Sequence, residues 1–373
     1  MDFDFSDDQQ QLRDAVRRWV EKGYTFDRRR AITGAGGFDR SVYAELASLG
    51  LTGLYIADTH GGTGMGPVEA LVAMEELGRG MVHEPLGQAL IAGAILSGYA
   101  PDALKSRWLP GIAAGDALVS LAHQERKARY RLDICDTLAV PTATSAGDGW
   151  ALTGAKSLVP AGDRADGFLV PARDGDTLSL FLVENGASGV ATRGYLTQDG
   201  GRAAELTLQS APAVRVASDG QRALEHAIDI GIAATCAEAV GVLDRTFDLT
   251  AEYLNTRKQF GVTLGTFQAL RHRMADMKMQ LELARSMSYY ASMKLNAPEN
   301  ERRLAMARAK VQLGTSMRFV GQNAVQLHGG IGVTDEYLGS HCFKKLTQLE
   351  LTFGDTLHHL GEVSSRMPET AGV

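Results

Sequence analysis

One short stretch of the sequence places side chains that could hold a phosphate-bearing group between two helical segments. Arg257 stands at the end of the first segment and is followed by Phe260. The second segment begins near Thr266 and continues with apolar residues at helical spacing. A guanidinium can fork onto a phosphate while an aromatic ring three residues later packs flat beside it. The same arginine also fits a surface ion pair, so the pattern alone leaves both roles open.

A second stretch, at 322–332, reads Gln-Asn-Ala-Val-Gln-Leu-His-Gly-Gly-Ile-Gly. Together with the stretch at 253–268, it resembles the acyl-CoA dehydrogenase family, in which a flavin oxidises the Cα–Cβ bond of an acyl thioester. The resemblance implies that both stretches bind the FAD of a neighbouring subunit. The arginine and phenylalanine would contact the pyrophosphate, and the glutamine and paired glycines would lie towards the adenine. The residues so implied are Arg257, Phe260, Gln268, Gln326, Gly329 and Gly330. A capping amide is the other interpretation of Gln326.

The catalytic base that the family uses is missing from both places where it occurs. Dehydrogenation needs a base to take the α-proton. Members of the family use a glutamate at one of two positions, and both positions are glycines here, Gly231 and Gly354. A positioned base contributes roughly two to four powers of ten in rate, so its loss leaves little activity. Asp355 is the neighbouring carboxylate and is either an atypical base or a cap for the helix that follows. Thr356 and His358, in the same segment, are further flavin contacts that the resemblance implies.

Two segments that support the flavin ring in the family also differ here. The first is replaced by 122–129, Ala-His-Gln-Glu-Arg-Lys-Ala-Arg, which lacks glycines that would let the backbone approach a ring. In the second, 154–162, Leu158 replaces an aromatic residue and Pro160 replaces a hydroxyl residue. Proline has no N–H to offer a flavin. Gly154, Lys156 and Gly162 are retained, so we expect an intact fold without the flavin-ring contacts.

The order of patterns along the chain predicts an α+β protein with three domains. We expect an N-terminal helical domain at 1–117, a middle antiparallel β domain at 118–217, and a C-terminal four-helix-bundle domain at 218–373 that carries the FAD interface. Expected helices include one opened by a capping box at 6–9, one at 38–51, one at 68–77 and one at 243–254. A long helix is expected from Phe267 towards Leu295. The glycine-rich loop at 61–66 has no strand before it, which favours a plain turn over a phosphate site.

Composition excludes several other classes of function. The net charge of −6 comes without a basic face, so we expect no nucleic-acid partner. We find no run of about 18 apolar residues and no signal-peptide pattern, and therefore expect no membrane span. The three scattered cysteines fit reduced thiols in the cytoplasm. The adjacent His358 and His359 lack metal-pair spacing, so no metal site is predicted.

These observations predict the small, catalytically degenerate subunit of a heteromeric acyl-CoA dehydrogenase of α2β2 type. A homologous large subunit would supply the glutamate and the acyl-CoA site, and an electron-transferring flavoprotein would accept the electrons. Two alternatives remain open. The chain could be a self-sufficient homomeric dehydrogenase whose base is Asp355 or an unrecognised residue, or a flavin-free scaffold that retains the fold.

Overall fold

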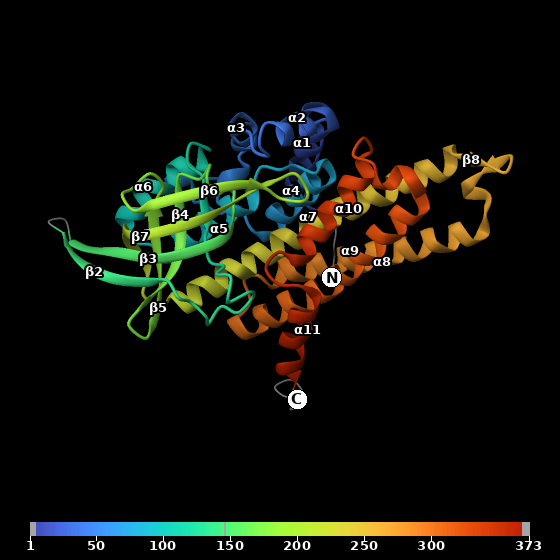
Figure 1. The fold of residues 1–373 in the computed structure, drawn as a ribbon. Helices are drawn as coiled ribbons and strands as arrows, with labels where there is room; N and C mark the ends of the chain where they lie inside the picture. The colour runs from blue at the N-terminus through green and yellow to red at the C-terminus, as the bar shows by residue number, and fades with distance from the viewer. Residues whose placement is uncertain (1–4, 145–146, 368–373) are drawn as a thin grey trace. The chain divides into compact units, whose positions relative to one another are not determined.

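The computed structural model describes residues 5–144 and 147–367 and divides the chain into two compact units (Figure 1). The first unit contains residues 5–29, 67–82 and 232–367, and the second contains 30–66, 83–144 and 147–231. The helical, β and helical regions follow each other in the expected order. The compact units cut across that order, so the division at 117 and 217 stays a prediction.

The N-terminal region is helical up to Ala113, as the sequence predicts. The expected capping box is present, because the Ser6 side chain accepts a hydrogen bond from the Gln9 backbone and the Gln9 side chain accepts one in return. The predicted helix at 38–51 is shorter than expected, because Asp39 caps its start and Gly50, with φ of 77°, follows its end. The helices are α1 (Asp7–Gly23), α2 (Phe26–Gly34), α3 (Arg40–Ser48), α4 (Pro67–Gly80), α5 (Leu86–Tyr99) and α6 (Asp102–Ala113).

The middle region forms one seven-stranded sheet in the order β1-β4-β2-β3-β7-β5, with β6 paired to β7. The sheet folds back on itself, because β4 also pairs with β5. The predicted antiparallel pairing holds for most of the sheet, but β1 runs parallel to β4, and β2 meets β4 in parallel at one residue pair. The strands are β1 (Val119–Leu121), β2 (Leu138–Thr144), β3 (Gly147–Pro160), β4 (Gly167–Asp174), β5 (Thr177–Glu184), β6 (Val190–Leu196) and β7 (Arg202–Ala217).

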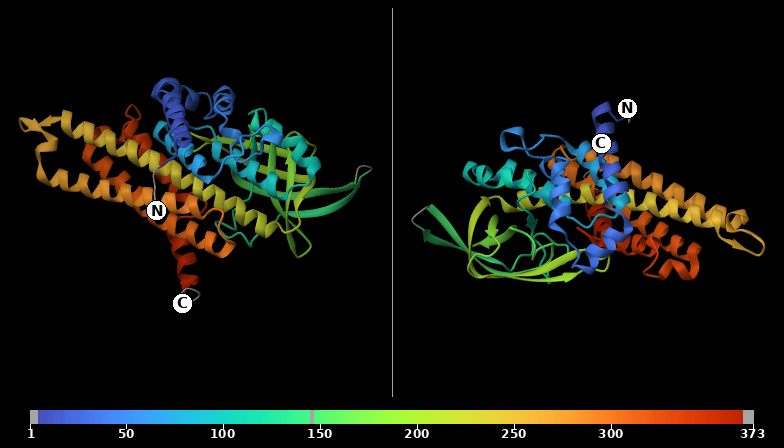
Figure 2. Two further views of the ribbon diagram at one scale, coloured as in Figure 1. Left: turned by 180° about the vertical axis from the view of Figure 1, so that it is seen from behind. Right: turned by 90° about the horizontal axis from the view of Figure 1, so that it is seen from above.

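The C-terminal region consists of helices, with a two-stranded hairpin between the first two. Figures 1 and 2 show α8 and α9 side by side, and the hairpin at the ends of α7 and α8. A fifth helix, α11, packs on α9 in addition to the four expected helices. The elements are α7 (Gly220–Thr256), β8 (Lys258–Gln259), β9 (Val262–Thr263), α8 (Gln268–Lys294), α9 (Glu299–His328), α10 (Leu338–Leu351) and α11 (Thr356–Ser365).

Helix α7 is more apolar than predicted. It runs for 37 residues, from the start of the predicted C-terminal helical domain through the helix expected at 243–254. It is also the one helix in the described residues that is long and apolar enough to cross a membrane, which corrects the expectation that no such segment exists. Within the structure, 89% of its most apolar window is buried. That burial is typical of a helix in a protein core.

Candidate functional site

The segment that carries the predicted arginine forms a tight turn at the ends of α7 and α8. Strands β8 and β9 pair through Lys258 with Thr263 and Gln259 with Val262. The two turn residues both have positive φ, 55° at Phe260 and 81° at Gly261, which is the geometry of a two-residue hairpin turn. Phe260 is 90% exposed, and its ring meets that of Phe267 edge to face at 6.3 Å. The hairpin therefore exposes an aromatic ring on the surface of this chain.

Polar groups on the same segment are also exposed. Arg257 directly follows α7, and Gln268 is the first residue of α8. Both side chains are exposed. Within residues 5–144 and 147–367, the Arg257 guanidinium has no hydrogen-bond or ion-pair partner. The surface ion pair that the sequence left open is thus not formed within this part of the chain, and the guanidinium remains able to bind an anion.

The glycine segment lies at the end of α9. Gln326 is exposed in the last turn of the helix, and the helix ends at His328. Gly329 has a φ of 63°, and Gly330 continues into a short 3-10 helix. Both glycines are exposed, and a methyl group added to either would meet nothing within 4 Å. The paired glycines therefore leave open backbone at the surface of this chain.

Side-chain contacts bring the two segments to the same end of the helices. The ring of Tyr253, one turn before Arg257, lies 4.7 Å from the ring of His328. Arg273, in the second turn of α8, donates a 3.1 Å hydrogen bond to Asn323 near the end of α9. These contacts lie between residues some 50 to 75 positions apart in the sequence, so spacing alone could not reveal them. All six residues predicted to hold FAD therefore belong to two neighbouring segments.

The position expected for the family glutamate is shaped for glycine. Gly354 is buried with a φ of 111°, a conformation that side-chain-bearing residues rarely adopt. A β-carbon there would lie 2.6 Å from His359 Nε2 and 2.7 Å from His358 Cδ2. The other expected position, Gly231, is a buried residue inside α7. Neither glycine has a side chain that could accept a proton, and at Gly354 the two histidine rings also occupy the space that a β-carbon would need.

The neighbouring polar residues are engaged in capping α11. The Asp355 carboxylate accepts a 2.8 Å hydrogen bond from the His358 backbone and is the N-cap of the helix. The Thr356 hydroxyl and backbone N–H both donate to Glu350 Oε1, at 2.6 and 3.0 Å. The His358 side chain is half-buried, and burial lowers its pKa. The roles of Asp355, Thr356 and His358 towards a cofactor stay predictions.

A buried lysine, which sequence analysis did not detect, binds the main chain just before this turn. Lys310 on α9 is 1% exposed, and its ammonium donates to three main-chain carbonyls at the end of α10. The acceptors are Leu349, Glu350 and Thr352, at 2.9, 3.0 and 2.8 Å. Burial lowers the pKa of Lys310 to about 8. The ammonium satisfies carbonyls that a helix end otherwise leaves without partners.

His359 makes the stability of this region depend on pH. Burial, and then the nearby Lys310 charge, lower the pKa of His359 to about 3. The folded protein favours neutral His359, whereas the unfolded chain protonates it below its ordinary pKa of about 6.5. The free energy of unfolding is therefore highest above pH 6.5 and falls as the pH drops towards 3. We expect wild-type protein to lose up to about 1.4 kcal/mol per pH unit from this residue between pH 6 and 4. His359→Gln should remove that slope.

The measurement is urea unfolding of both proteins at several pH values, with His272→Gln as the control. His272 is an exposed histidine on α8, so its replacement should leave the pH slope of wild-type protein unchanged. Equal slopes for His359→Gln and wild type would show that His359 does not stay neutral in the folded protein.

In the second unit, the two segments that differ from the family pattern lie side by side. The Ser157 backbone N–H donates to Gln124 O at 2.8 Å, so it is already engaged within the chain. Between the segments, Glu125 accepts hydrogen bonds from Lys156 Nζ at 2.7 Å and from the Thr137 hydroxyl at 2.7 Å. The Asp136 backbone donates to the second carboxylate oxygen at 2.7 Å. A closed polar cluster thus stands where this chain's β domain would support a flavin ring.

Both charges of this cluster are inside the protein. The Lys156 side chain is 0% exposed and that of Glu125 is 7% exposed. Burial alone would raise the pKa of Glu125, but the Lys156 ammonium and the hydrogen bonds outweigh burial and lower it to about 2. Glu125 therefore stays ionised and holds the segment against β3. Sequence analysis retained Lys156 as part of the scaffold but did not identify its partner.

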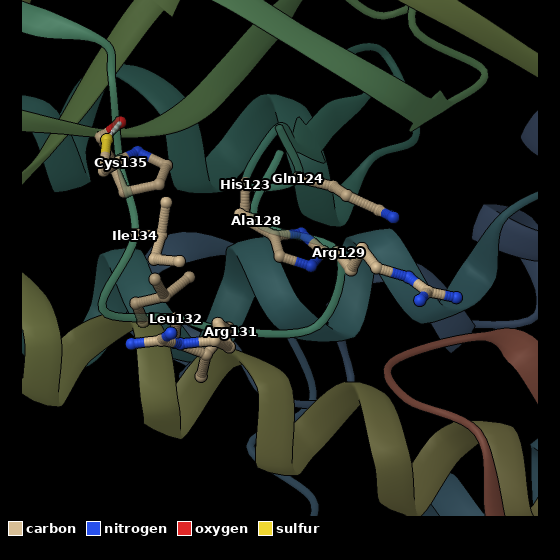
Figure 3. Close-up of a pocket in the computed structure, with 10 residues that line it drawn as sticks. His123, Gln124, Ala128, Arg129, Arg131, Leu132, Ile134 and Cys135 are labelled. Atoms are coloured by element: carbon tan, nitrogen blue, oxygen red, sulfur yellow. Dashed lines mark hydrogen bonds between the residues drawn. The ribbon is translucent and has the colours of Figure 1, made fainter. Parts of the chain in front are cut away.

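A small pocket adjoins this cluster, and Figure 3 shows the segment around 123–135 that forms much of its wall. Its volume is about 10 Å³, which is room for about one water molecule. His123 and Cys135 line it, and burial lowers the pKa of His123 to about 4. The pocket is too small for a flavin ring or an acyl chain. No group of three or more metal-binding side chains occurs within the described part of the chain.

The chemistry of the residues present fits half of an FAD site. An exposed guanidinium, an exposed ring and two exposed amides near open glycine backbone suit the pyrophosphate and adenine ends of FAD. The β-domain segments do not suit the isoalloxazine, because Pro160 has no N–H and the Ser157 N–H is already bonded to Gln124.

Comparison with known proteins agrees with the fold and the motifs. Models of the acyl-CoA dehydrogenase N-terminal and C-terminal domains match residues 6–116 and 218–367. Acyl-CoA dehydrogenase FadE27 of Mycobacterium tuberculosis is 26% identical over 344 residues, which is 89% of each chain. A structure described as a variant of the Tcur3481–Tcur3483 steroid ACAD is 30% identical, with a TM-score of 0.90 over 98% of this chain and 99% of that one. The ChsE4–ChsE5 complex from Mycobacterium tuberculosis is 26% identical, with a TM-score of 0.89 over 99% of each chain.

The fold and the two family models define an FAD-dependent oxidoreductase, and the chain belongs to the acyl-CoA dehydrogenase family. The expected fold of a helical domain, a middle β domain and a C-terminal helical domain is confirmed. FAD is the cofactor of this family, as the sequence resemblance implied.

Proposed function

We propose that this chain is the small, non-catalytic subunit of a heteromeric acyl-CoA dehydrogenase. A homologous large subunit supplies the glutamate, the acyl-CoA pocket and the isoalloxazine site. This chain contributes the hairpin that carries Arg257 and the loop that carries Gly329 and Gly330. The assembly is of α2β2 type, and each pair of unlike chains holds a single FAD at the site shared between them.

The observation that carries this proposal is the conformation of Gly354. The glutamate position combines a φ of 111° with two histidine rings that occupy the space of a β-carbon. A chain that had lost only the catalytic side chain would still have room for it. Here the backbone and its neighbours are built around glycine. This chain therefore depends on another polypeptide for the base.

The asymmetry between the two halves of the FAD site supports the same proposal. The parts that act on a neighbour's flavin are exposed and free to bind, and the part that would hold a flavin of its own is closed by Glu125 and Lys156. Two similar structures, described as the Tcur3481–Tcur3483 steroid ACAD and the ChsE4–ChsE5 complex, each join two named chains. A paired arrangement of this kind is the form we propose here.

In the self-sufficient alternative, Asp355 or an unrecognised residue acts as the base, and Asp355 is the named candidate. Its carboxylate already accepts a hydrogen bond from the helix that it caps, and this engagement disfavours free access to a substrate α-proton. We further propose a cytoplasmic location, since Cys135, Cys236 and Cys342 are free and buried. The proposed electron acceptor is an electron-transferring flavoprotein.

Turnover assays test the proposal. The chain alone, the candidate large subunit alone and their mixture are each given FAD, an electron acceptor and fatty acyl-CoA or steroid acyl-CoA thioesters. We expect turnover only in the mixture. Turnover by this chain alone would contradict the proposal and support the self-sufficient alternative.

Replacement of Gly354 should destabilise the protein without creating a base. We expect Gly354→Ala to lower the free energy of unfolding by about 2–4 kcal/mol, because it adds backbone strain and forces His359 to move. Gly354→Glu should be at least as unstable and should give the chain no turnover of its own. Urea unfolding and the assay above measure both effects.

Gly361→Ala is the matched control for this prediction. Gly361 lies on α11, and a methyl group added there would meet nothing within 4 Å. Alanine is favoured over glycine inside a helix, so this variant should be as stable as wild type or more stable. Wild-type stability for Gly354→Ala would show that the turn is not built around glycine.

A further inference from the structure

The loop that carries Gly329 and Gly330 is closed at its base by one side-chain contact. His328 is the last residue of α9, and Tyr337 is the residue before α10. The Tyr337 hydroxyl lies 2.8 Å from His328 Nε2. Their rings are 5.0 Å apart. This contact joins the residues at the two ends of the glycine loop, in addition to the packing of α10 on α9.

The hydrogen-bond partners determine which ring nitrogen of His328 carries the proton. Nδ1 lies 2.8 Å from the Ala324 carbonyl oxygen, which can only accept, so Nδ1 is the protonated nitrogen. Nε2 then has a free lone pair and accepts the Tyr337 hydroxyl proton. The residue is 4% exposed, and burial favours its neutral form. Both nitrogens of His328 are thus engaged in one defined tautomer.

His328 also contacts the segment that carries the arginine. Its ring lies 4.7 Å from that of Tyr253, with an interplanar angle of 37°. Tyr253 is one helical turn before Arg257, and the Tyr253 carbonyl accepts a 2.8 Å hydrogen bond from the Arg257 backbone N–H. One imidazole is therefore packed between the two segments that we assign to the FAD half-site.

We propose that His328, with Tyr337, is the positioning element that sets the glycine loop relative to Arg257. This inference rests on the proposed function, because it concerns the half-site that this chain gives to its partner. His328 is buried behind the exposed Gln326, Gly329 and Gly330 and acts through them. Its loss should weaken binding of FAD without altering the chemical step, which takes place on the partner chain.

Three variants test the inference in the complex with the large subunit. His328→Phe keeps an aromatic ring but removes both hydrogen bonds, and Tyr337→Phe removes only the hydroxyl. Each should weaken FAD binding by about 10-fold, because each removes the contact between the two ends of the glycine loop and so loosens the loop before FAD binds. His328→Gln retains an acceptor near the place of Nε2 and should recover affinity to within about 3-fold of wild type.

The double variant His328→Phe with Tyr337→Phe separates a paired role from two independent ones. If the two residues act as one unit, the double variant should bind FAD about as weakly as either single variant. Independent roles would give about a 100-fold loss, which would contradict the paired role. Tyr289→Phe, which removes a hydroxyl from a tyrosine whose ring contacts Phe5, is the control and should bind FAD normally.

The readouts are the FAD dissociation constant of the apo complex, the association of the two chains, and kcat per bound FAD. We expect only the first to change. A merely structural role would reduce chain association and kcat per bound FAD in parallel with FAD affinity, and would overturn the inference. If both single variants bind FAD normally while Arg257→Gln binds it weakly, the inference is overturned but the proposed function stands. Failure of the wild-type pair to bind FAD would overturn both.

Discussion

Glu125→Gln should lower the free energy of unfolding of the unit that contains the β-sheet by about 3–5 kcal/mol, because it leaves the Lys156 ammonium buried without a counter-charge. Lys156 Nζ is 2.7 Å from the carboxylate and its side chain is 0% exposed, so water cannot replace the lost partner. The neutral amide also replaces a charged acceptor for the Thr137 and Asp136 donors. Urea unfolding measures the change, followed by tryptophan fluorescence, since Trp108 and Trp150 both lie in this unit.

Two further variants separate the buried pair from simple loss of charge. Glu125→Gln combined with Lys156→Met removes both charges but keeps an acceptor for the Thr137 and Asp136 donors, so it should recover most of the stability, because no uncompensated charge remains. Lys127→Gln breaks the exposed ion pair with Asp136, in which the two side chains are 84% and 64% exposed, and should leave the unfolding free energy nearly unchanged. A Glu125→Gln protein as stable as the Lys127→Gln protein would contradict this account of the cluster.

Arg257→Gln should weaken FAD binding by the mixed complex about 100-fold, because it removes a charged, forked donor from the pyrophosphate. The guanidinium is exposed and has no partner within residues 5–144 and 147–367, so the substitution should change the stability of the chain by no more than about 0.5 kcal/mol. A substitution that weakens cofactor binding without lowering the unfolding free energy is expected at a residue that contacts the cofactor directly. Fluorescence titration of the apo complex with FAD measures the affinity.

Lys258→Gln is the matched control for this second prediction. Lys258 is the next residue, is exposed in β8, and its loss changes the net charge by the same amount. General attraction of an anionic cofactor to a basic hairpin would give equal losses for both variants. A much larger loss for Arg257→Gln is expected from a direct contact.

Local sequence patterns predicted the elements that depend on neighbouring residues. The capping box at Ser6 and the start of α8 at Gln268 follow from hydrogen bonds or periodicity within a few residues. The helix at 38–51 was drawn too long because apolar spacing continues past Gly50, where the backbone takes a positive φ. Helical structure was also predicted over α7, but not the burial of its most apolar window, which is 89% buried.

The features that were missed depend on contacts between distant residues. Glu125 and Lys156 are 31 positions apart, and nothing in either segment marks them as a pair. His328 stands inside a motif that the sequence did reveal, but its partners come from α7 and from the residue before α10. The sequence identified Gly354 as a missing side chain. Only the structure shows that the backbone and two histidines exclude one.

The most direct test of the central claim is the flavin content of this chain, expressed alone and then together with its candidate large subunit. The account predicts little flavin in the chain alone and a single FAD for each pair of unlike chains in the purified complex. A full complement of FAD in the chain alone, with turnover of an acyl-CoA, would contradict it, and Asp355→Asn would then test the remaining candidate for the base.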